Sequence, residues 1–534
     1  MTTASLEPEQ FAGQSLSNNG IISRKNWTLI LTAFALYVVV GFYFLDKYPL
    51  IYGDEAYYNE PPIQFLKSRT FRTDLFPPLG GFDVSNLING RIFAFIQVFV
   101  FSIFGQSVIT LRLQSFVAGL LSILLIYASA HSLFKNKRAA VFTSGVFALS
   151  HLLIFASHFG RPDMTVCLFA LASFTLFLQA LKSDKAWQFL LSGMLAALCV
   201  DVHPPGNVAI FIMWAAAMQQ YFAKKIQFKS LCYVGVGITL GILWWLSLHV
   251  FPDPALFINQ RPLTAVSQVN SLLGNPINQL LLEFHRWKSF FWYGAFHRNM
   301  FLLLLLSLSA IYGILHRSQT AYPLLIAAIV GGFLGYTISA PNKTVWYIIY
   351  IYPFFILLIV PTLYAAACSQ TRWMRTCGLA LGLIYALFLA SENYYKLPFY
   401  RSNYNAFMEK VRQVLPKNST VLALESYWFG LKDHVKFRMS MNTVGFKYIM
   451  PQHGIGLDYY AGSLEDFLRR NHIDYIIADP EIVSTAWSAV DITNLITEKC
   501  DFVGEVTDEF YGTSIYIARK SPAPITTKIY KIKQ

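Results

Sequence analysis

Charge is scarce in this sequence. Only 13% of its 534 residues are charged and 55% are hydrophobic, whereas a soluble domain normally carries about 25% charged residues. The six cysteines form no CxxC pair, which excludes a zinc-ribbon pattern and provides no disulfide framework. The net charge of +13 is not gathered in a basic tract with interleaved aromatic residues. We therefore expect no nucleic-acid partner and interpret the positive charge as a signal of membrane orientation.

Uncharged runs that are long enough to cross a bilayer are abundant. A transmembrane helix needs about 20 apolar residues to cross a hydrocarbon core of about 30 Å. The first run is longer than the apolar region of a secretory signal and has no small-residue cleavage site after it, so we expect it to be retained. The pattern predicts a polytopic α-helical membrane protein with about eleven transmembrane helices, at 27–45, 108–133, 139–157, 164–181, 187–202, 205–222, 230–250, 299–316, 321–340, 344–366 and 376–391.

One further apolar segment, residues 90–106, is too short for a standard span. If it crossed the membrane, the later basic loops would fall on the opposite side. We therefore predict an interfacial, juxtamembrane helix there. With the amino terminus cytoplasmic, the basic loops between the spans then all face the cytoplasm, as the positive-inside rule expects.

This topology divides the chain into three parts. A cytoplasmic tail (1–26) precedes a transmembrane domain (27–391), and a small extracytoplasmic α/β domain (392–534) follows. Two outer loops of the transmembrane domain are long, 46–107 and 251–298. In the last part, "YNAFMEKVRQVL" predicts an amphipathic helix, "STVLALES" a strand, "LEDFLRRNHIDYIIAD" a helix and a strand, and "DFVGEVTDEF" with "TSIYIARK" a terminal strand pair.

The interiors of the predicted spans contain essentially no carboxylates. A charge at the centre of the bilayer costs about 2.5–3.5 kcal/mol, and ion-coupled transporters bear that cost because they need such groups. Their absence from the spans disfavours coupled transport.

Ionisable groups gather instead in the predicted outer loops. Asp54 and Glu55 follow the first span, Arg161 and Asp163 lie in the turn "HFGRPDM", and Lys343 lies in "APNKTVWY". Short turns hold such groups close to the membrane surface, where the headgroup of a lipid substrate would lie. A carboxylate can act as general base for an incoming hydroxyl, and cations can neutralise a lipid-borne phosphate as it departs.

The same acidic residues would suit a divalent metal. Asp54, Glu55 and Asp163 are hard oxygen ligands of the kind that Mg²⁺ or Mn²⁺ prefers. We regard Asp54 and Asp163 as the candidate metal ligands. No His-rich constellation calls for zinc.

Four segments of the sequence resemble those of a known group of enzymes. "YGDEAYY", "FGQSVITLRLQSFVAGLLSILLIYASAHSLF", "HFGRPDM" and "NKTVWYIIYIYPFFILL" resemble the family 39 and family 83 membrane glycosyltransferases. These belong to the GT-C group, which includes protein mannosyltransferases and the lipid A aminoarabinose transferases. The resemblance covers roughly residues 25–370.

The resemblance implies a polyprenyl-phosphate-sugar donor, inversion at the anomeric carbon and an outward-facing active site, here in a bacterial inner (plasma) membrane. Asp54 matches the catalytic acidic position and Glu55 its partner, and Asp163 matches the second acidic residue. Lys343 stands where relatives place a basic contact to the donor phosphate. Arg161, together with His203 in the turn after the predicted span 187–202, completes the expected phosphate-binding group.

The sequence departs from the lipid A branch at two places. Tyr57 and Tyr58 stand where that branch usually has an arginine, and His203 to Gly206 replace its Lys-Gly-Pro. Neither aminoarabinose nor lipid A is therefore implied as a specific substrate.

The expected activity is that of a hexosyl- or pentosyltransferase. We expect it to move a sugar to a lipid, glycan or protein acceptor on the non-cytoplasmic face of the membrane, among membrane lipids, with Asp54 as base. Two alternatives stay open: a flippase or transporter of lipid-linked sugars, and a scaffold whose C-terminal domain binds a partner.

Overall fold

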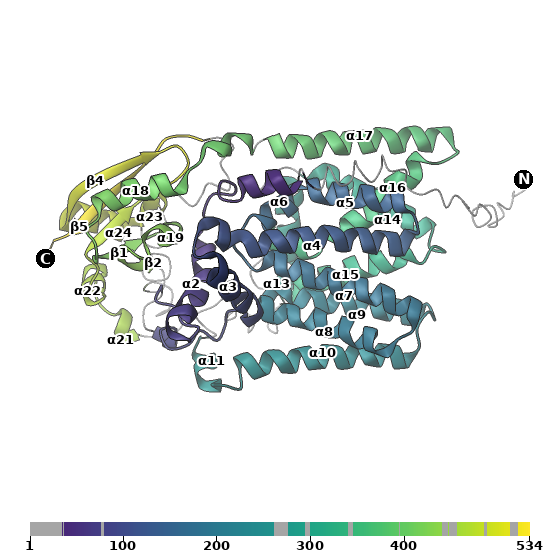
Figure 1. Ribbon diagram of the computed structural model, residues 1–534, viewed down its shortest axis with the longest axis horizontal. Helices are drawn as coiled ribbons and strands as arrows, with labels where there is room; N and C mark the ends of the chain where they lie inside the picture. The colour runs from purple at the N-terminus through teal and green to yellow at the C-terminus, as the bar shows by residue number, and fades with distance from the viewer. Residues whose placement is uncertain are drawn as a thin grey trace, which may run out of the picture.

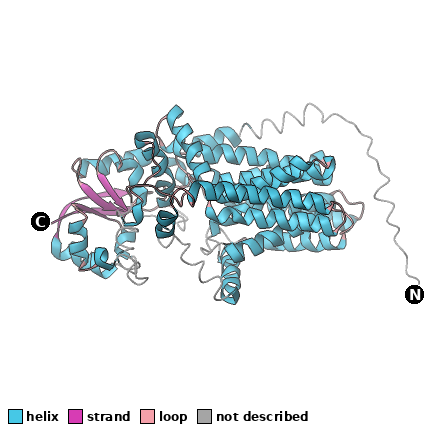
Figure 2. Ribbon diagram, turned by 90° about the horizontal axis from the view of Figure 1, so that it is seen from below, coloured by secondary structure: helices cyan, strands magenta, loops and turns pink. Residues whose placement is uncertain are grey.

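The computed structural model describes residues 35, 37–75, 79–260, 276–293, 299–339, 345–394, 396–439, 447, 457–484, 489–512 and 522–533. Long helices run side by side along the long axis of the molecule, and a small sheet lies at one end (Figures 1 and 2). The helices α2 and α3 lie between the long helices and the sheet (Figure 1). Two predicted features fall outside the described residues. They are the candidate site residue Lys343 and the second strand of the predicted terminal pair, 513–520.

Apolar helices occur where the sequence predicts the spans from residue 108 onward. Within the described part of the chain, five helical segments are long and apolar enough to cross a membrane, and a bent pair makes a sixth. The five are α4 (Val108–Phe134), α7 (Asp163–Ser183), α10 (Phe228–His249), α15 (Ala321–Ser339) and the segment of α17 (Arg372–Tyr394); the bent pair is α5 (Lys137–Leu149) with α6 (His151–Ser157). Four apolar helices are shorter: α3 (Arg91–Phe104), α8 (Ala186–Val202), α14 (Met300–Leu315) and α16 (Tyr352–Ala367). The total of eleven spans and their orientation stay predictions.

Three predicted spans are not continuous α-helices, and one of them, 205–222, begins in the 3₁₀-helix η3 (Pro204–Asn207) before α9 (Val208–Phe222). The run 139–157 bends by 61° between α5 and α6, where Ser150 has an extended backbone and its hydroxyl donates to the carbonyl of Phe147 (2.7 Å). Such a side-chain bond competes with the helical backbone bonds. The run 344–366 begins as the 3₁₀-helix η7 (Val345–Tyr350) before α16, because Pro353 cannot donate a backbone hydrogen bond and suits only the first turn of a helix.

The first outer loop is largely helical, which the sequence analysis did not predict for its first half. The helix α2 (Gly53–Ser68) starts directly at the acidic pair. The apolar run after it forms α3, which exposes Phe95, Phe99 and Ile103 on one face. An exposed apolar face of this kind is typical of a helix that lies in the bilayer interface.

Two glycines bring α8 and α10 into backbone contact. A Cβ atom on Gly193 would lie 2.1 Å from the carbonyl oxygen of Val234, and one on Gly237 would lie 1.9 Å from that of Leu190. Small residues are the usual means of close helix approach in membranes. This contact places the outer ends of α8 and α10, with Asp201 and His249, next to the start of α3.

The C-terminal part contains a five-stranded sheet in the order β2-β1-β3-β5-β4. The strands are β1 (Thr420–Ala423), β2 (Lys436–Met439), β3 (Tyr475–Ala478), β4 (Cys500–Asp508) and β5 (Ile525–Ile532). The predicted strands at β1 and β3 are present. The partner of β4 in this structure is β5, in antiparallel register, a strand that the sequence analysis missed.

Short helices complete the described fold. They are η2 (Leu79–Gly81), η3 (Pro204–Asn207), α9 (Val208–Phe222), α11 (Pro254–Gln260), α13 (Pro276–Lys288), the π-helical turn η6 (Ser289–Tyr293), η8 (Leu397–Arg401), α18 (Tyr404–Val414), η9 (Glu425–Tyr427), α19 (Trp428–Leu431), α21 (Leu457–Tyr460), α22 (Leu464–Arg470), α23 (Pro480–Ser484) and α24 (Ala489–Lys499). The predicted amphipathic helix corresponds to α18 and the predicted helix before β3 to α22.

The C-terminal sheet shares a hydrophobic core with the first outer loop. Leu50, Ile63 and Phe101 of that loop belong to the same buried cluster as Phe407 and Leu422 of the C-terminal part. A second cluster fills the bundle of long helices. The first outer loop and the C-terminal part thus pack against each other through a common apolar interior. The predicted domain boundary between 391 and 392 stays a prediction.

Candidate active site

Asp54, Asp163 and Arg161 come together at the end of the helix bundle that faces the C-terminal sheet (Figure 1). Asp54 lies in the first turn of α2, and Asp163 is the first residue of α7. The guanidinium of Arg161 lies between them: its Nε donates to Asp163 Oδ2 (2.7 Å), and its Nη1 forms an ion pair with Asp54 Oδ2. One buried arginine thus joins acids that are 109 positions apart in the sequence.

The two aspartates differ in their access to solvent. The side chain of Asp54 is 41% exposed and that of Asp163 is 5% exposed. Desolvation raises the pKa of Asp54, Arg161 lowers it, and the carboxylates of Asp163 and Glu55 raise it again, with a net upward shift. Burial lowers the pKa of Arg161, but its two acidic partners outweigh burial and raise that pKa well above its ordinary value. Arg161 therefore stays a cation, and Asp54 is the carboxylate that a substrate can reach.

A chain of hydrogen bonds through Tyr58, His203 and Tyr350 ends at Asp163. Tyr350 Oη donates to Asp163 Oδ1 (2.7 Å) and therefore accepts from Nδ1 of His203 (2.8 Å). The other ring nitrogen of His203 accepts from Tyr58 Oη (2.8 Å). Burial lowers the pKa of His203 to about 4, so the imidazole is neutral near pH 7. Both of its nitrogens are occupied by tyrosines.

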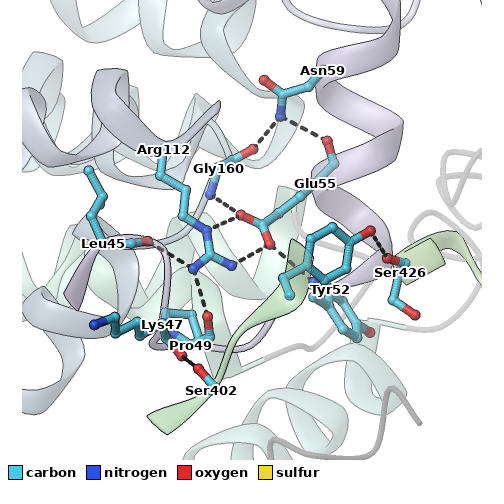
Figure 3. A network of polar contacts seen from close by, with 11 residues as sticks. Leu45, Lys47, Pro49, Tyr52, Glu55, Asn59, Arg112, Gly160, Ser402 and Ser426 are labelled. Atoms are coloured by element: carbon cyan, nitrogen blue, oxygen red, sulfur yellow. Dashed lines mark hydrogen bonds and ion pairs between the residues drawn. The ribbon is translucent and has the colours of Figure 1, made fainter. Parts of the chain in front are cut away.

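Glu55 belongs to a separate network with Arg112 and Gly160 (Figure 3). Its carboxylate receives Nε and Nη2 of Arg112 (both 2.7 Å) and the backbone N–H groups of Gly160 (2.8 Å) and Tyr52 (3.0 Å). Arg112 uses its remaining nitrogen, Nη1, to donate to the carbonyls of Leu45 (3.0 Å) and Pro49 (2.7 Å). The ion pair of Glu55 and Arg112 is fully buried. Its hydrogen bonds link α2 to α4 and to the segment that precedes α2.

The turn that carries Arg161 is fastened from both sides. Asn59 of α2 donates to the carbonyl of Gly160 (2.7 Å), and Ser115 of α4 donates to the carbonyl of Arg161 (2.9 Å). A Cβ atom on Gly160 would lie 2.2 Å from a side-chain carbon of Leu111. Only glycine fits at this position, and the turn is held in one place relative to Asp54.

A fully buried arginine on α13 is the residue that sequence reasoning did not single out. The Nε and Nη1 of Arg286 have no hydrogen-bond partner within the described part of the chain, while Nη2 is paired with Glu283. Its guanidinium lies 4.0 Å from the ring centre of Tyr336, which stacks on Tyr350 (6.3 Å between centroids). Arg286 is therefore separated from Asp163 by Tyr336 and by Tyr350, which contacts Asp163.

The pattern on α13 could have revealed this arginine. Leu281 and Phe284 are exposed while Glu283 and Arg286 are buried. A helix that exposes apolar side chains and buries its charged ones indicates a polar interior. The signal for Arg112 is similar: it is a single arginine in the first turns of an apolar run.

The arrangement of Asp54 and Asp163 does not fit a metal ion between them, because the guanidinium of Arg161 occupies that place. Among the residues that the structure describes, no group of three or more His, Cys, Asp or Glu side chains is arranged to hold a metal. The groups that face the site are a cation, two carboxylates and several phenols.

Comparison with solved structures decides the fold. The crystal structure of ArnT from Cupriavidus metallidurans in the apo state superposes with a TM-score of 0.56 at 15% identity, covering 95% of this chain and 98% of that one. The same protein bound to undecaprenyl phosphate gives a TM-score of 0.53 at 14% identity, with 94% and 98% covered. The oligosaccharyltransferase of Archaeoglobus fulgidus in complex with Zn and sulfate gives 0.50 at 14% identity, with 89% and 71% covered.

The chain has the GT-C fold. A family profile described as "Dolichyl-phosphate-mannose-protein mannosyltransferase" matches residues 90–258 of this GT-C chain. The resemblance that the sequence motifs indicate is therefore confirmed. The matched range contains Arg112, Arg161, Asp163 and His203, whereas Asp54 and Arg286 lie outside it. A comparison with curated proteins finds no match.

Proposed function

We propose that this GT-C protein transfers a sugar from a polyprenyl-phosphate donor to an acceptor on the non-cytoplasmic face of the membrane. The observation that carries the proposal is the accessible Asp54, held by Arg161 beside the buried Asp163. The likeness to ArnT, which has been crystallised with undecaprenyl phosphate, supports a lipid-linked donor.

Asp54 is the general base in this proposal. Its carboxylate takes the proton of the acceptor hydroxyl or amine as that group attacks the anomeric carbon. The new glycosidic bond forms on one face of the sugar while the bond to the phosphate oxygen breaks on the other, and the electron pair leaves with the phosphate. The raised pKa of Asp54 makes it a stronger base than an ordinary aspartate.

Arg161 and Arg286 are the cations for the departing phosphate. Buried N–H groups are nearly always paired, and charged ones above all. The unpaired Nε and Nη1 of Arg286 form a fork that suits two phosphate oxygens. Lys343, which the sequence analysis predicts to contact the phosphate, remains a further candidate.

The remaining predicted residues hold the reacting groups in place. Glu55 is buried and bound on both oxygens, so we assign it to positioning of α2 rather than to chemistry. His203 is neutral and bound on both nitrogens. We assign it to orienting Tyr350 and through it Asp163, rather than to binding phosphate as a cation.

The test is Asp54→Asn. Membranes are incubated with a panel of radiolabelled polyprenyl-phosphate sugars, and donor consumption and product are both measured. We expect transfer to fall by at least about 100-fold, because a general base contributes typically 10²–10⁴-fold, with folded protein unchanged. Asp83→Asn is the matched control, since Asp83 is an exposed carboxylate of the same outer loop.

The pH profile tests the same assignment. Asp54 must be deprotonated to act, so transfer should be lost as the pH falls through its pKa. Because that pKa is raised, the loss should occur at a higher pH than for an ordinary aspartate, near 3.9. Near-normal turnover by Asp54→Asn would remove the mechanism. If the variant still moved lipid-linked sugar across sealed vesicles while the wild type made no product, the flippase alternative would replace it.

A further inference from the structure

A cavity of about 620 Å³ lies between two turns of the helix bundle, the turn from α7 to α8 and the turn from α9 to α10. These turns are at the end of the bundle that is farther from α3 and the C-terminal sheet (Figure 1). The predicted topology places this end on the cytoplasmic side, so the cavity is remote from Asp54. Its volume falls in the range of small-molecule sites, about 300–1,000 Å³.

Charged side chains of both signs line this cavity. Asp184 follows α7, and Lys224 and Lys225 follow α9. Within the described part of the chain, none of the three forms an ion pair with another or with any further side chain. Opposite charges that line one cavity without pairing suit a ligand that carries the complementary charges. Such a ligand has an anionic group for the two lysines and a cationic group for Asp184.

The two turns that carry these charges are held by backbone hydrogen bonds. The N–H of Asp184 donates to the carbonyl of Ala180 (2.8 Å), and that of Lys225 donates to the carbonyl of Gln220 (2.9 Å). The close packing of α8 on α10 also fixes one turn relative to the other, because each turn leads into one of these helices. The backbone of the site is therefore ordered before a ligand arrives, which lowers the cost of binding.

Large apolar side chains border the cavity. Phe189 lines its buried part, and Phe222 lines it where the side chain is 72% exposed. Trp187 and Phe228, in the first turns of α8 and α10, are exposed nearby. Exposed aromatic residues at the ends of apolar helices are typical of the level of the lipid headgroups. The ligand that fits therefore has an apolar part beside its two opposite charges.

We propose that this cavity binds the headgroup of phosphatidylethanolamine, independently of the proposed sugar transfer. The phosphate pairs with Lys224 and Lys225, the primary ammonium pairs with Asp184, and the acyl chains lie among the exposed aromatic residues. Asp184 is the selective group, because a charge-assisted hydrogen bond to an ammonium is stronger than one to the neutral hydroxyls of phosphatidylglycerol. Phosphatidylcholine has no N–H on its quaternary nitrogen and cannot form this bond.

Cross-linking tests the site without relying on catalysis. The purified full-length protein is placed in nanodiscs of one bilayer composition. Each disc contains a small fraction of phosphatidylethanolamine, phosphatidylglycerol or phosphatidylcholine with a diazirine near the glycerol end of an acyl chain. We expect phosphatidylethanolamine to label peptides that contain the two turns about 3-fold more than the other two lipids do, which is the effect of one exposed ion pair. Peptides of α14 should be labelled equally by all three probes.

Two variants separate the two charged groups of the lipid. Asp184→Asn removes the carboxylate but keeps a residue that tolerates the left-handed backbone at this position (φ 51°). It should lower labelling by phosphatidylethanolamine to that by phosphatidylglycerol. Lys224→Gln combined with Lys225→Gln should lower labelling by both of these lipids.

Lys185→Gln is the matched control, since Lys185 is an exposed neighbour of Asp184 that does not line the cavity. It should leave the preference for phosphatidylethanolamine unchanged, and the thermal unfolding midpoint checks that each variant is folded. Three results would overturn the assignment: equal labelling of the two turns by the three lipids, a preference that survives Asp184→Asn, or an equal loss of preference in Lys185→Gln.

Discussion

At the scale of single residues, three buried arginines have three different surroundings. Arg112 has every nitrogen bound by protein oxygens, so it has a structural task. Arg161 is shared between two aspartates, one of them accessible. Arg286 keeps two N–H positions without a partner in the described residues. The arginine with the most unsatisfied hydrogen-bonding capacity is the one we expect to bind a ligand.

Arg286→Gln should therefore weaken donor binding more than it slows turnover. The loss of a charged hydrogen bond costs about 1.5–3 kcal/mol, which corresponds to a KM for the donor about 10- to 150-fold higher. Steady-state kinetics with a fixed acceptor measure it. His285→Gln, an exposed neighbour on α13, is the control. An unchanged KM in Arg286→Gln would mean that the fork does not contact the donor.

At the scale of elements, the juxtamembrane helix α3 is held by a polar cluster between α8 and α10. Asp201 accepts from the backbone N–H of Arg91 (3.0 Å), from His249 Nε2 (2.7 Å) and from Trp244 Nε1 (3.2 Å). His249 Nδ1 contacts the carbonyl of Leu87 (2.5 Å). The sequence placed Asp201 and His249 at the outer ends of their spans, but nothing in it showed that they meet.

Asp201→Ala should detach α3 from the bundle. It leaves three donors without their acceptor, and each unsatisfied buried group costs about 1–3 kcal/mol. We expect a lower thermal unfolding midpoint in detergent and faster proteolysis between α2 and α4. Asp83→Ala, in the exposed turn before α3, should change neither. Equal midpoints for the two variants would show that α3 does not depend on Asp201.

At the scale of the whole molecule, the C-terminal sheet region and α2 are parts of one packed unit. The hydroxyl of Ser402 donates to the carbonyl of Lys47 (3.0 Å), and Arg438 Nη1 donates to the carbonyl of Asp74 (2.7 Å). Glu425, just after β1, lies so close to Gly53 that a Cβ there would be 2.8 Å from its own Cβ. The C-terminal region thus packs against Gly53, the residue that precedes Asp54.

Gly53→Ala should disturb both parts at once. The added methyl group meets Glu425, and overpacking of this kind costs about 1–3 kcal/mol. We expect lower transfer activity together with easier proteolytic release of the C-terminal region, and partial recovery in Gly53→Ala with Glu425→Gly. Gly145→Ala is the control, since a side chain there meets nothing within 4 Å. Full activity in Gly53→Ala would show that the two parts are not coupled at this contact.

Much of the site was predictable because its chemistry is concentrated in short motifs. Asp54, Arg161 and Asp163 were identified from an acidic pair after a span and a charged turn between two spans. The roles that we propose for Glu55 and His203 were not predictable in the same way. Two neighbouring carboxylates look equivalent in sequence, and only the position of Arg112 shows that the oxygens of Glu55 are already occupied.

The sequence by itself determined that this is a membrane protein with apolar helices from residue 108 onward. Burying a charge in lipid is costly, so the long runs with few charges identify the spans. Tertiary structure alone decided which polar groups meet: Arg161 with the distant Asp54, Arg286 with the ring of Tyr336 next to Tyr350, and the C-terminal sheet with α2. The physical reason is one of range. Hydropathy is a sum over neighbouring residues, whereas these contacts depend on atoms a few ångströms apart in residues that the sequence separates by fifty positions or more.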